Sequence, residues 1–335
     1  MKNILIIDTD PSIDDAIAFL MAIARHDLFD KVIINTTAGN STITNVTNNA
    51  LKILELVEAR HIIVNRGASA PLVKAHILAD HVYGKMGLDG LDLPNPSMTA
   101  SLQSSYDCLI DTVVQNPPGT VTLCCLAPLT NVAIAIKKRP DIIHKIKKII
   151  IMGGAFSEAG NITPAAEFNI YVDPEAAQIV FTSFPEVVCI PLDCTHKAII
   201  TKDILERFRR VSQPLGNTLY ILLKYAKAYD TKKYNFGGAP LHDPTVIAYL
   251  IDKNIFSTKK VSVKVDARNG LTRGATIVDQ YNNKKYKNNV LLVDGIDDSR
   301  YFDVVFECLD RYPLNQHHHN DECSPTYHEG SPELP

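Results

Sequence analysis

Near the start of the chain, residues 4–15 read Ile4-Leu5-Ile6-Ile7-Asp8-Thr9-Asp10-Pro11-Ser12-Ile13-Asp14-Asp15. The apolar run at the beginning of this stretch predicts a buried strand, and the segment 16–22 after it predicts a helix joined to the strand by a tight loop. Ligands of open α/β sheets bind beyond the carboxyl ends of the strands. We therefore expect the four aspartates of this stretch to lie at a ligand-binding edge of a sheet.

Four carboxylates packed this closely repel one another unless they are protonated, solvated or bound to a cation. A hard divalent ion prefers carboxylate oxygens, so Ca²⁺ or Mg²⁺ is the first expectation. The alternative is structural: Asp14 and Asp15 favour a helix N-terminus through its dipole, while Asp8 and Asp10 are turn residues. A helix start rarely needs more than one or two anions, which favours the cation site.

The composition narrows the classes of partner. The chain has 335 residues, 46% of them hydrophobic, which is enough to bury a large core as one or two domains. Its net charge of -3 shows no basic excess, so nucleic acid and anionic membranes are poor partners and a small molecule is expected. No apolar stretch reaches the roughly 18 residues of a spanning helix, and residues 1–3 lead directly into a strand rather than a signal peptide. We therefore expect a cytoplasmic protein.

The seven cysteines have neither a C-x-x-C pair nor zinc-site spacing. Cys124 and Cys125 lie in a strand-like segment, where neighbouring side chains point to opposite faces, and this disfavours a disulfide between them. We expect small core residues in a reducing compartment.

Strand-like and helix-like segments alternate through the first two thirds of the chain. This alternation predicts an α/β fold, with a Rossmann-like, open and mainly parallel β-sheet flanked by helices. The expected strands after the first are residues 32–36, 62–64, 121–126, 149–151, 187–190, 261–265, 276–279 and 290–293. Asp173-Pro174 and Asp243-Pro244 each place a capping residue before a proline and so predict two helix starts, and residues 301–309 predict a closing helix.

No repeat or linker divides the chain, so we expect one catalytic domain over residues 1–313. The remaining residues, 314–335, are polar and contain proline, which predicts a disordered tail. Its run His317-His318-His319 could hold a metal, although such tracts are more often solvated segments.

Several polar clusters follow the strand-like runs, and together they resemble one family, the nucleoside hydrolases. The resemblance covers residues 4–309 and depends on Asp8 to Asp15, Gly39-Asn40, Gly87-Leu88-Asp89-Gly90, Pro128-Leu129-Thr130-Asn131, Met152-Gly153-Gly154, Asn161 to Asn169 and His242-Asp243-Pro244. Each piece alone is weak, because short acidic or glycine motifs recur by chance. Their conjunction is highly specific.

The resemblance implies a calcium ion held by Asp10, Asp15, Asp243 and the backbone carbonyl of Leu126, a ligand set made only of oxygen. It also implies that Asp10 is the general base, which takes a proton from a metal-bound water that attacks the anomeric carbon. Cleavage passes through a cation-like sugar, so an anionic pocket stabilises the transition state. The implied reaction is hydrolysis of the N-glycosidic bond of ribonucleosides, in nucleoside salvage.

The resemblance implies several substrate contacts as well. Asp14 binds the 2′-hydroxyl and Asn169 the 3′-hydroxyl, Asn161 and Glu167 bind the 5′-hydroxyl, and Asn40 supports the ribose. Met152 and Phe168 lie in the matched motifs and are also expected to bind the substrate. His242, a residue type that titrates near neutral pH, is the expected proton donor to the leaving base. Tyr225 and Tyr229, four residues apart on an expected helix, face the base or form a core pair.

Two residues depart from the family pattern. Ser12 replaces the usual glycine after Asp-Pro, so the loop must form without glycine's freedom at positive φ. Tyr83 stands where many relatives have a histidine near the base, which favours the inosine-uridine preferring group over a carried-over pyrimidine-specific mechanism. The family also suggests a homodimer or homotetramer.

Two rival functions share part of this pattern. Asp8-x-Asp10 at a strand end suggests a magnesium-dependent phosphatase of the haloacid dehalogenase type, but the residues that follow differ from that motif. The second rival is a non-catalytic protein that binds ribose or nucleosides on the same fold. The presence of every implied ligand and of the base Asp10 favours the enzyme.

Overall fold

The computed structural model describes residues 2–90, 92–234, 237–281, 283 and 286–313. Its strands are β1 (Ile4–Thr9), β2 (Lys31–Thr36), β3 (Ile63–Arg66), β4 (Ser101–Ser104), β5 (Val121–Cys125), β6 (Lys148–Met152), β7 (Val187–Ile190), β8 (Ile199–Ile200), β9 (Ala239–Pro240), β10 (Phe256–Val265), β11 (Thr276–Asp279) and β12 (Val290–Ile296). The expected tail at 314–335, with its histidine run and Cys323, lies outside the described residues.

The helices alternate with these strands. They are α1 (Ile13–Ala24), α2 (Ile43–Leu56), α3 (Asp80–Tyr83), α4 (Ser105–Gln115), α5 (Thr130–Lys138), η1 (Pro140–His144), α6 (Phe168–Val172), α7 (Pro174–Ser183), α8 (Leu192–Thr195), α9 (Lys202–Arg210), α10 (Leu215–Tyr234), α11 (Pro244–Ile251), η2 (Lys253–Ile255) and α12 (Asp298–Leu309). The helix starts predicted at the two Asp-Pro pairs are confirmed, since α7 and α11 begin at their prolines.

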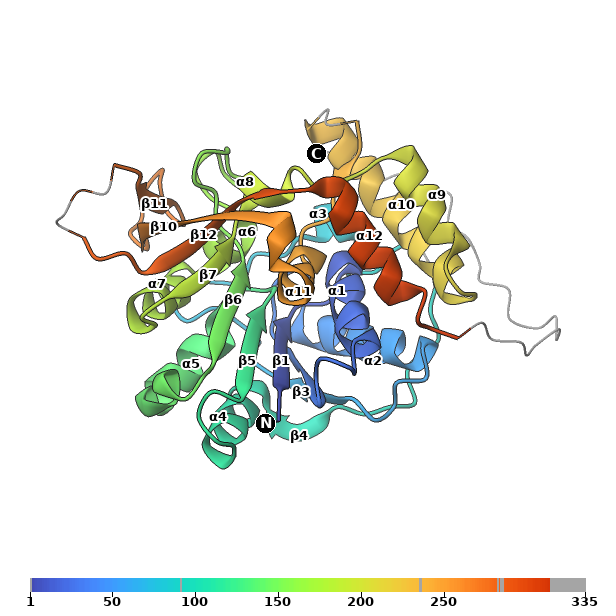
Figure 1. The fold of residues 1–335 in the computed structure, drawn as a ribbon, viewed down its shortest axis with the longest axis horizontal. Helices are drawn as coiled ribbons and strands as arrows, with labels where there is room; N and C mark the ends of the chain where they lie inside the picture. The colour runs from blue at the N-terminus through green and yellow to red at the C-terminus, as the bar shows by residue number, and fades with distance from the viewer. Residues whose placement is uncertain (1, 91, 235–236, 282, 284–285, 314–335) are drawn as a thin grey trace.

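A ten-stranded sheet runs through the centre of the molecule in the order β11-β10-β12-β7-β6-β5-β1-β2-β3-β4. The pairs from β4 to β12 are parallel, and β10 pairs antiparallel with both β12 and β11. Figure 1 shows these last strands extending from one end of the sheet. The predicted α/β fold with a mainly parallel sheet is therefore confirmed.

The chain builds this sheet in two directions from β1. From β1 it adds β2, β3 and β4 on one side, and it then crosses back to place β5, β6 and β7 on the other. The order therefore reverses between β1 and β5, and open α/β sheets bind ligands at the carboxyl ends of the strands beside such a reversal. The aspartate-rich loop follows β1 at this place, which we call the crevice.

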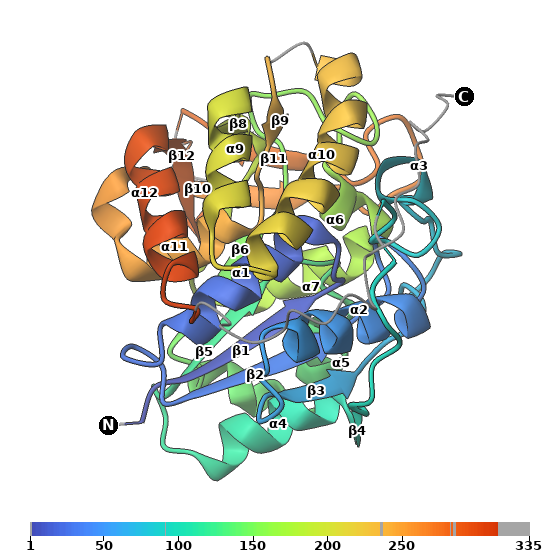
Figure 2. The ribbon, with the colours of Figure 1, turned by 90° about the vertical axis from the view of Figure 1, so that its right-hand side faces the viewer.

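Alternate residues of β1 face opposite layers of the core. Leu5 and Ile7 pack in the layer that contains α1, α2, α11 and α12, whereas Ile4 and Ile6 pack in the layer that contains α4, α5 and α7. Figure 2 shows helices on both sides of the sheet. A strand covered on both faces must be apolar at every position, which explains the uninterrupted run at residues 4–7.

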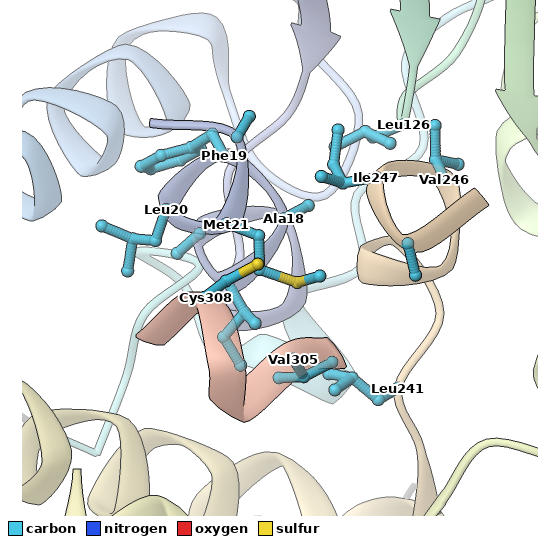
Figure 3. Close-up of a cluster of buried hydrophobic side chains, with 14 of the residues drawn as sticks. Ala18, Phe19, Leu20, Met21, Leu126, Leu241, Val246, Ile247, Val305 and Cys308 are labelled. Atoms are coloured by element: carbon cyan, nitrogen blue, oxygen red, sulfur yellow. The ribbon is translucent and has the colours of Figure 1, made fainter. Parts of the chain in front are cut away.

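Helix α1 is buried nearly all round, because α11 and α12 pack against it. Figure 3 shows Phe19 and Met21 of α1 in one apolar cluster with Val305 and Cys308 of α12. Burial on this scale holds the N-terminus of α1 rigidly below the crevice.

The six described cysteines are free and buried, which confirms that they are small core residues. Among the described residues, no helix combines the length and the apolar character needed to cross a membrane.

Candidate active site

Three buried aspartates lie where β1 passes into α1: Asp10 in the loop, and Asp14 and Asp15 in the first turn of the helix. Asp10, Asp14 and Asp15 are at most 6% exposed. Asp15 accepts hydrogen bonds from the Thr9 hydroxyl at 2.5 Å and from the Ser12 backbone N–H and hydroxyl, both at 3.0 Å. The turn that closes this loop therefore aims its carboxylates at one another.

Asp243 joins this group from the opposite end of the sequence. One carboxylate oxygen each of Asp14, Asp15 and Asp243 lies within 4.8 Å of the other two, and all three residues are buried. Three such oxygens in a buried pocket form a ligand set that suits a hard cation. The ligand set implied by the family resemblance contains Asp10 in place of Asp14, and the structure thus adds Asp14 to the residues that could hold a metal.

Asp10 lies beside this group with one oxygen held and one available. Its Oδ2 accepts the backbone N–H of Asn40 at 2.6 Å, whereas its Oδ1 is buried without a hydrogen-bond partner. A buried carboxylate oxygen normally has a partner, so this atom fits a cation or a water. Gly39 makes the approach possible, because a Cβ at that position would collide with Asp10 Oδ2.

Leu126 presents its carbonyl to the crevice one residue after β5. This oxygen accepts the Asn169 side-chain amide at 2.8 Å, while the leucine side chain is buried and lies near Ile247 in Figure 3. The side chain and the carbonyl therefore have separate roles, so the identity of residue 126 can change without loss of the carbonyl. The same Asn169 amide donates to the Met152 carbonyl at 3.2 Å.

The segment 161–169 folds into a tight loop that ends at α6. Glu167 caps α6 by accepting the N–H groups of Asn169 and Ile170, and it also accepts the N–H of Gly154 at 2.9 Å. The Asn161 side chain accepts the N–H of Phe168 at 2.8 Å. Hydrogen bonds thus hold Met152, Glu167 and Asn169 together, whereas the Asn161 contact with Phe168 shapes the loop itself.

His242 is partly buried next to Asp243. Its Nδ1 shares a 2.8 Å hydrogen bond with the Thr195 hydroxyl, and its ring centroid lies 5.9 Å from that of His196. Burial, with a smaller contribution from His196, lowers the pKa of His242 to about 3. The expectation of a histidine titrating near neutral pH is therefore not met in the protein alone, where a neutral imidazole can donate a hydrogen bond only from one ring nitrogen.

Burial raises the pKa values of the acidic residues in the crevice. It is the largest cause for Asp10 and Asp243, whose pKa values lie well above the usual range, and the neighbouring carboxylates add to it. The pKa of Asp14 rises to about 6, through burial and then the charge of Asp15. Burial also raises the pKa of Glu167. Without a counter-charge these groups hold their protons to higher pH than an exposed carboxyl group does, and a bound cation would displace those protons.

A cavity adjoins the aspartate loop on the side of α10. Tyr225 of α10 lines this cavity of about 740 Å³ together with Asn49, Leu88 and Asp89. The side chain of Tyr229 lies outside the described residues. The cavity is bordered by the Gly87–Gly90 motif, and Asn49 ties that motif to the aspartate loop by donating to the carbonyls of Pro11 and Met86.

Ser12 enters the loop without the strain that a missing glycine could cause. Its φ is -101°, so a residue with a side chain adopts it freely. The loop therefore needs no positive φ at residue 12, and serine can replace the usual glycine there without backbone strain.

Two supporting residues were given no role by the sequence. Asn131 donates to Asp8 Oδ2 at 3.0 Å and to the Thr36 carbonyl at 3.0 Å, so it joins β1 to β2 beneath the crevice. Thr195 orients His242. Asn131 belongs to the motif Pro128-Leu129-Thr130-Asn131, so the sequence did point to it. No local pattern points to Thr195.

Comparisons with known proteins agree with this geometry. The family model of the inosine-uridine preferring nucleoside hydrolases matches residues 5–303. An uncharacterised protein of Schizosaccharomyces pombe is 42% identical over 92% of this chain and 99% of its own length. The pyrimidine-specific ribonucleoside hydrolase RihA of Salmonella arizonae is 41% identical over 92% of this chain and 98% of its own.

A solved structure also matches. The purine-preferring ribonucleoside hydrolase from Gardnerella vaginalis superimposes with a TM-score of 0.85 at 30% identity, over 92% of this chain and 98% of that one. The fold and crevice thus define an enzyme that hydrolyses N-glycosidic bonds. The chain belongs to the inosine-uridine preferring nucleoside hydrolase family. Neither the phosphatase nor the non-catalytic alternative has support in these matches.

Proposed function

We propose that this chain is a calcium-dependent ribonucleoside hydrolase that releases free base and ribose for nucleoside salvage in the cytoplasm. The observation that carries the proposal is the meeting of Asp14, Asp15 and Asp243 within 4.8 Å, beside the unpartnered Oδ1 of Asp10. An oxygen-only, anionic and buried donor set suits Ca²⁺ better than zinc or copper, which favour nitrogen and sulfur.

The proposed ion site uses Asp10, Asp15, Asp243 and the Leu126 carbonyl, with Asp14 at its edge. When bound, calcium would supply a positive charge that acidifies water and holds vicinal hydroxyls. Asn169, which donates to the Leu126 carbonyl in this structure, lies where it can exchange that contact for a sugar hydroxyl. Glu167 is rigidly held by three backbone N–H groups and can orient the 5′ end of the ribose.

Asp10 is the proposed general base. One of its oxygens is fixed by the Asn40 N–H, so the other can accept a proton from attacking water without the carboxylate rotating. The surrounding carboxylates stabilise the positive charge that develops on the sugar ring. Attack by water without a covalent intermediate inverts the anomeric carbon, so β-ribofuranose as the first product in NMR would refute this step.

His242 is proposed to donate a hydrogen bond to the leaving base. Thr195 can accept or donate at Nδ1, and the role requires the tautomer in which Nε2 carries the hydrogen. Tyr225 and the adjoining cavity are proposed to face the base. The named relatives include both a pyrimidine-specific and a purine-preferring enzyme, so the base side must be tested with both classes.

The test is a panel of inosine, uridine, adenosine, guanosine and cytidine, assayed for reducing sugar. Full-length protein is compared as purified, after EDTA, and after return of Ca²⁺ or Mg²⁺. We expect ribose release that EDTA abolishes and Ca²⁺ restores. Release that survives EDTA would refute the metal requirement, and hydrolysis of p-nitrophenyl phosphate without nucleoside hydrolysis would refute the activity. Light scattering on the same sample tests the proposed homodimer or homotetramer.

A further inference from the structure

Ser12 lies inside the aspartate cluster rather than at its edge. The residue is 0% exposed, and its hydroxyl lies 2.8 Å from Asp14 Oδ1 and 3.0 Å from Asp15 Oδ2. These two carboxylates have different proposed roles, because Asp14 contacts the sugar and Asp15 binds the cation. A single hydroxyl therefore bridges the two sides of the proposed site.

The neighbouring hydrogen bonds determine which groups the Ser12 hydroxyl accepts from and donates to. The side-chain amide of Asn40 donates to Ser12 Oγ at 3.4 Å, so the serine oxygen is an acceptor on that side. Its only hydrogen is then shared between Asp14 Oδ1 and Asp15 Oδ2, with the shorter contact to Asp14. The result is a chain of hydrogen bonds from Asn40 through Ser12 to the aspartates, and such chains polarise and strengthen one another.

Ser12 is also the N-cap of helix α1 and forms a capping box with Asp15. Loss of the hydroxyl should weaken this cap modestly, but the other half of the box does not depend on it. The Ser12 backbone N–H donates to Asp15 Oδ2 at 3.0 Å, and the backbone makes this contact whatever the side chain is. Asp14 differs, since the Ser12 hydroxyl is the side-chain donor that the structure describes for it. Removal of the hydroxyl should therefore release Asp14 while α1 stays folded.

We propose that Ser12 is a positioning residue, whose hydroxyl holds the sugar-binding Asp14 in register with the cation-binding Asp15. This inference rests on the proposed function. It predicts that loss of the hydroxyl weakens both cation and nucleoside binding, because each ligand then has to order Asp14 when it binds. A hydrogen bond to a charged group corresponds to roughly a tenfold change in an equilibrium constant.

The test uses Ser12→Ala and Ser12→Gly in the full chain, with Ser105→Ala as the matched control. Ser105 is also 0% exposed, and its hydroxyl bonds the carbonyls of Thr36 and Asn65, away from any carboxylate. Calorimetry measures the Kd for Ca²⁺, and steady-state assays separate KM from kcat. For the Ser12 variants we expect both Kd and KM to rise about tenfold, with a smaller change in kcat. Unchanged or tighter Ca²⁺ binding with unchanged KM would overturn the inference.

A double-mutant cycle tests whether Ser12 acts through Asp14. Ser12→Ala is introduced into Asp14→Ala, which removes the acceptor oxygen, and KM is compared for all four proteins. If Asp14 mediates the effect, the serine change adds little in the Asp14→Ala background. Full additivity would overturn the inference. Circular dichroism and melting of each variant exclude a loss of fold as the cause.

These outcomes differ from failure of the proposed function. If the wild-type protein neither binds Ca²⁺ nor releases ribose, the proposed function fails. If the wild type does both and the Ser12 variants match Ser105→Ala, only the positioning inference fails.

Discussion

The two carboxylate oxygens of Asp10 differ, because Oδ2 is hydrogen-bonded and Oδ1 has no partner. This arrangement suits the proposed role of Asp10 as a general base. Asn40 holds Oδ2 through its backbone N–H, and Gly39 leaves the space for that contact. The raised pKa of Asp10 comes first from burial, and a bound cation would lower it, so the proposed role of Asp10 as a base depends on the proposed cation.

Asp10→Asn should lower kcat by roughly 10²–10⁴-fold, because an amide cannot take the proton from water. Its shape is nearly that of the aspartate, so the fold should persist. Turnover of inosine and circular dichroism measure the two effects. Asp266→Asn, in the turn between β10 and β11 where Asp266 pairs with Arg268, serves as the control and should keep wild-type kcat. Comparable kcat values for Asp10→Asn and the wild type would remove Asp10 from the role of base.

His242→Ala should impair hydrolysis of inosine more than that of p-nitrophenyl riboside, whose leaving group needs no proton. Because the pKa of His242 is lowered to about 3, the wild-type profile of kcat/KM should also show no limb from this histidine between about pH 5 and 8. Equal losses on both substrates would exclude His242 as the donor to the base.

Most strands of the large sheet could be predicted from the sequence, including the edge strand β11, whereas β4 and the two short strands β8 and β9 could not. The strand expected at 187–190 is confirmed as β7, because both of its faces are covered and it is apolar throughout. β4 was missed: it is an edge strand of polar sequence in which Leu102 is fully exposed, so it carries no hydrophobic alternation. The two-residue strands β8 and β9 exist only because they pair with each other.

The loop after β2, which contains Gly39, can be tested by substitution. Gly39→Ala should greatly reduce kcat with a modest loss of stability, since its Cβ would collide with the Asp10 carboxylate. Gly119→Ala is the contrasting variant. It has open space around it but a φ of +78°, so it should cost about 1 kcal/mol of stability and leave kcat unchanged. A wild-type kcat for Gly39→Ala would show that the loop can shift to make room for the methyl group without moving the Asp10 carboxylate.

At the scale of the whole molecule, the carboxyl groups of Asp8, Asp10, Asp14 and Asp243, whose pKa values are raised by burial, lie in or below the crevice. The pKa of Asp14 in the folded state is about 6 and that of Asp8 about 7, both raised from 3.8 chiefly by burial. Between pH 3.8 and these values the folded protein binds more protons than the unfolded chain. The metal-free protein is therefore most favoured at low pH and loses this contribution as the pH rises towards 7.

Added Ca²⁺ should consequently raise Tm more at pH 8 than at pH 5. The shift in Asp14 alone corresponds to at most about 3 kcal/mol, which sets the order of magnitude of the effect. Differential scanning calorimetry with Ca²⁺ and with EDTA at each pH isolates the difference, since other titrating groups cancel. A Ca²⁺ effect that shrinks as the pH rises would contradict this account.

We propose that residues 1–313 form one catalytic domain, because a single sheet joins strands from β1 to β12 and the site combines Asp14 and Asp15 with the distant Asp243. Deletion of residues 314–335 should leave kcat and Tm unchanged, with a single melting transition. A large loss of activity in the truncated protein would show that the terminal segment contributes to the site.

Local chemistry was enough to predict the α/β class, the aspartate loop at the end of β1 and the helix starts at residues 174 and 244, because each depends on neighbouring residues. Without the family resemblance, residue patterns could not reveal that Asp243 meets the aspartate loop, and nothing in the sequence revealed the lowered pKa of His242 or the bridge made by Ser12. Those features arise when the strand order reverses between β1 and β5 and the packed helices remove water, and both depend on contacts between residues far apart in the chain.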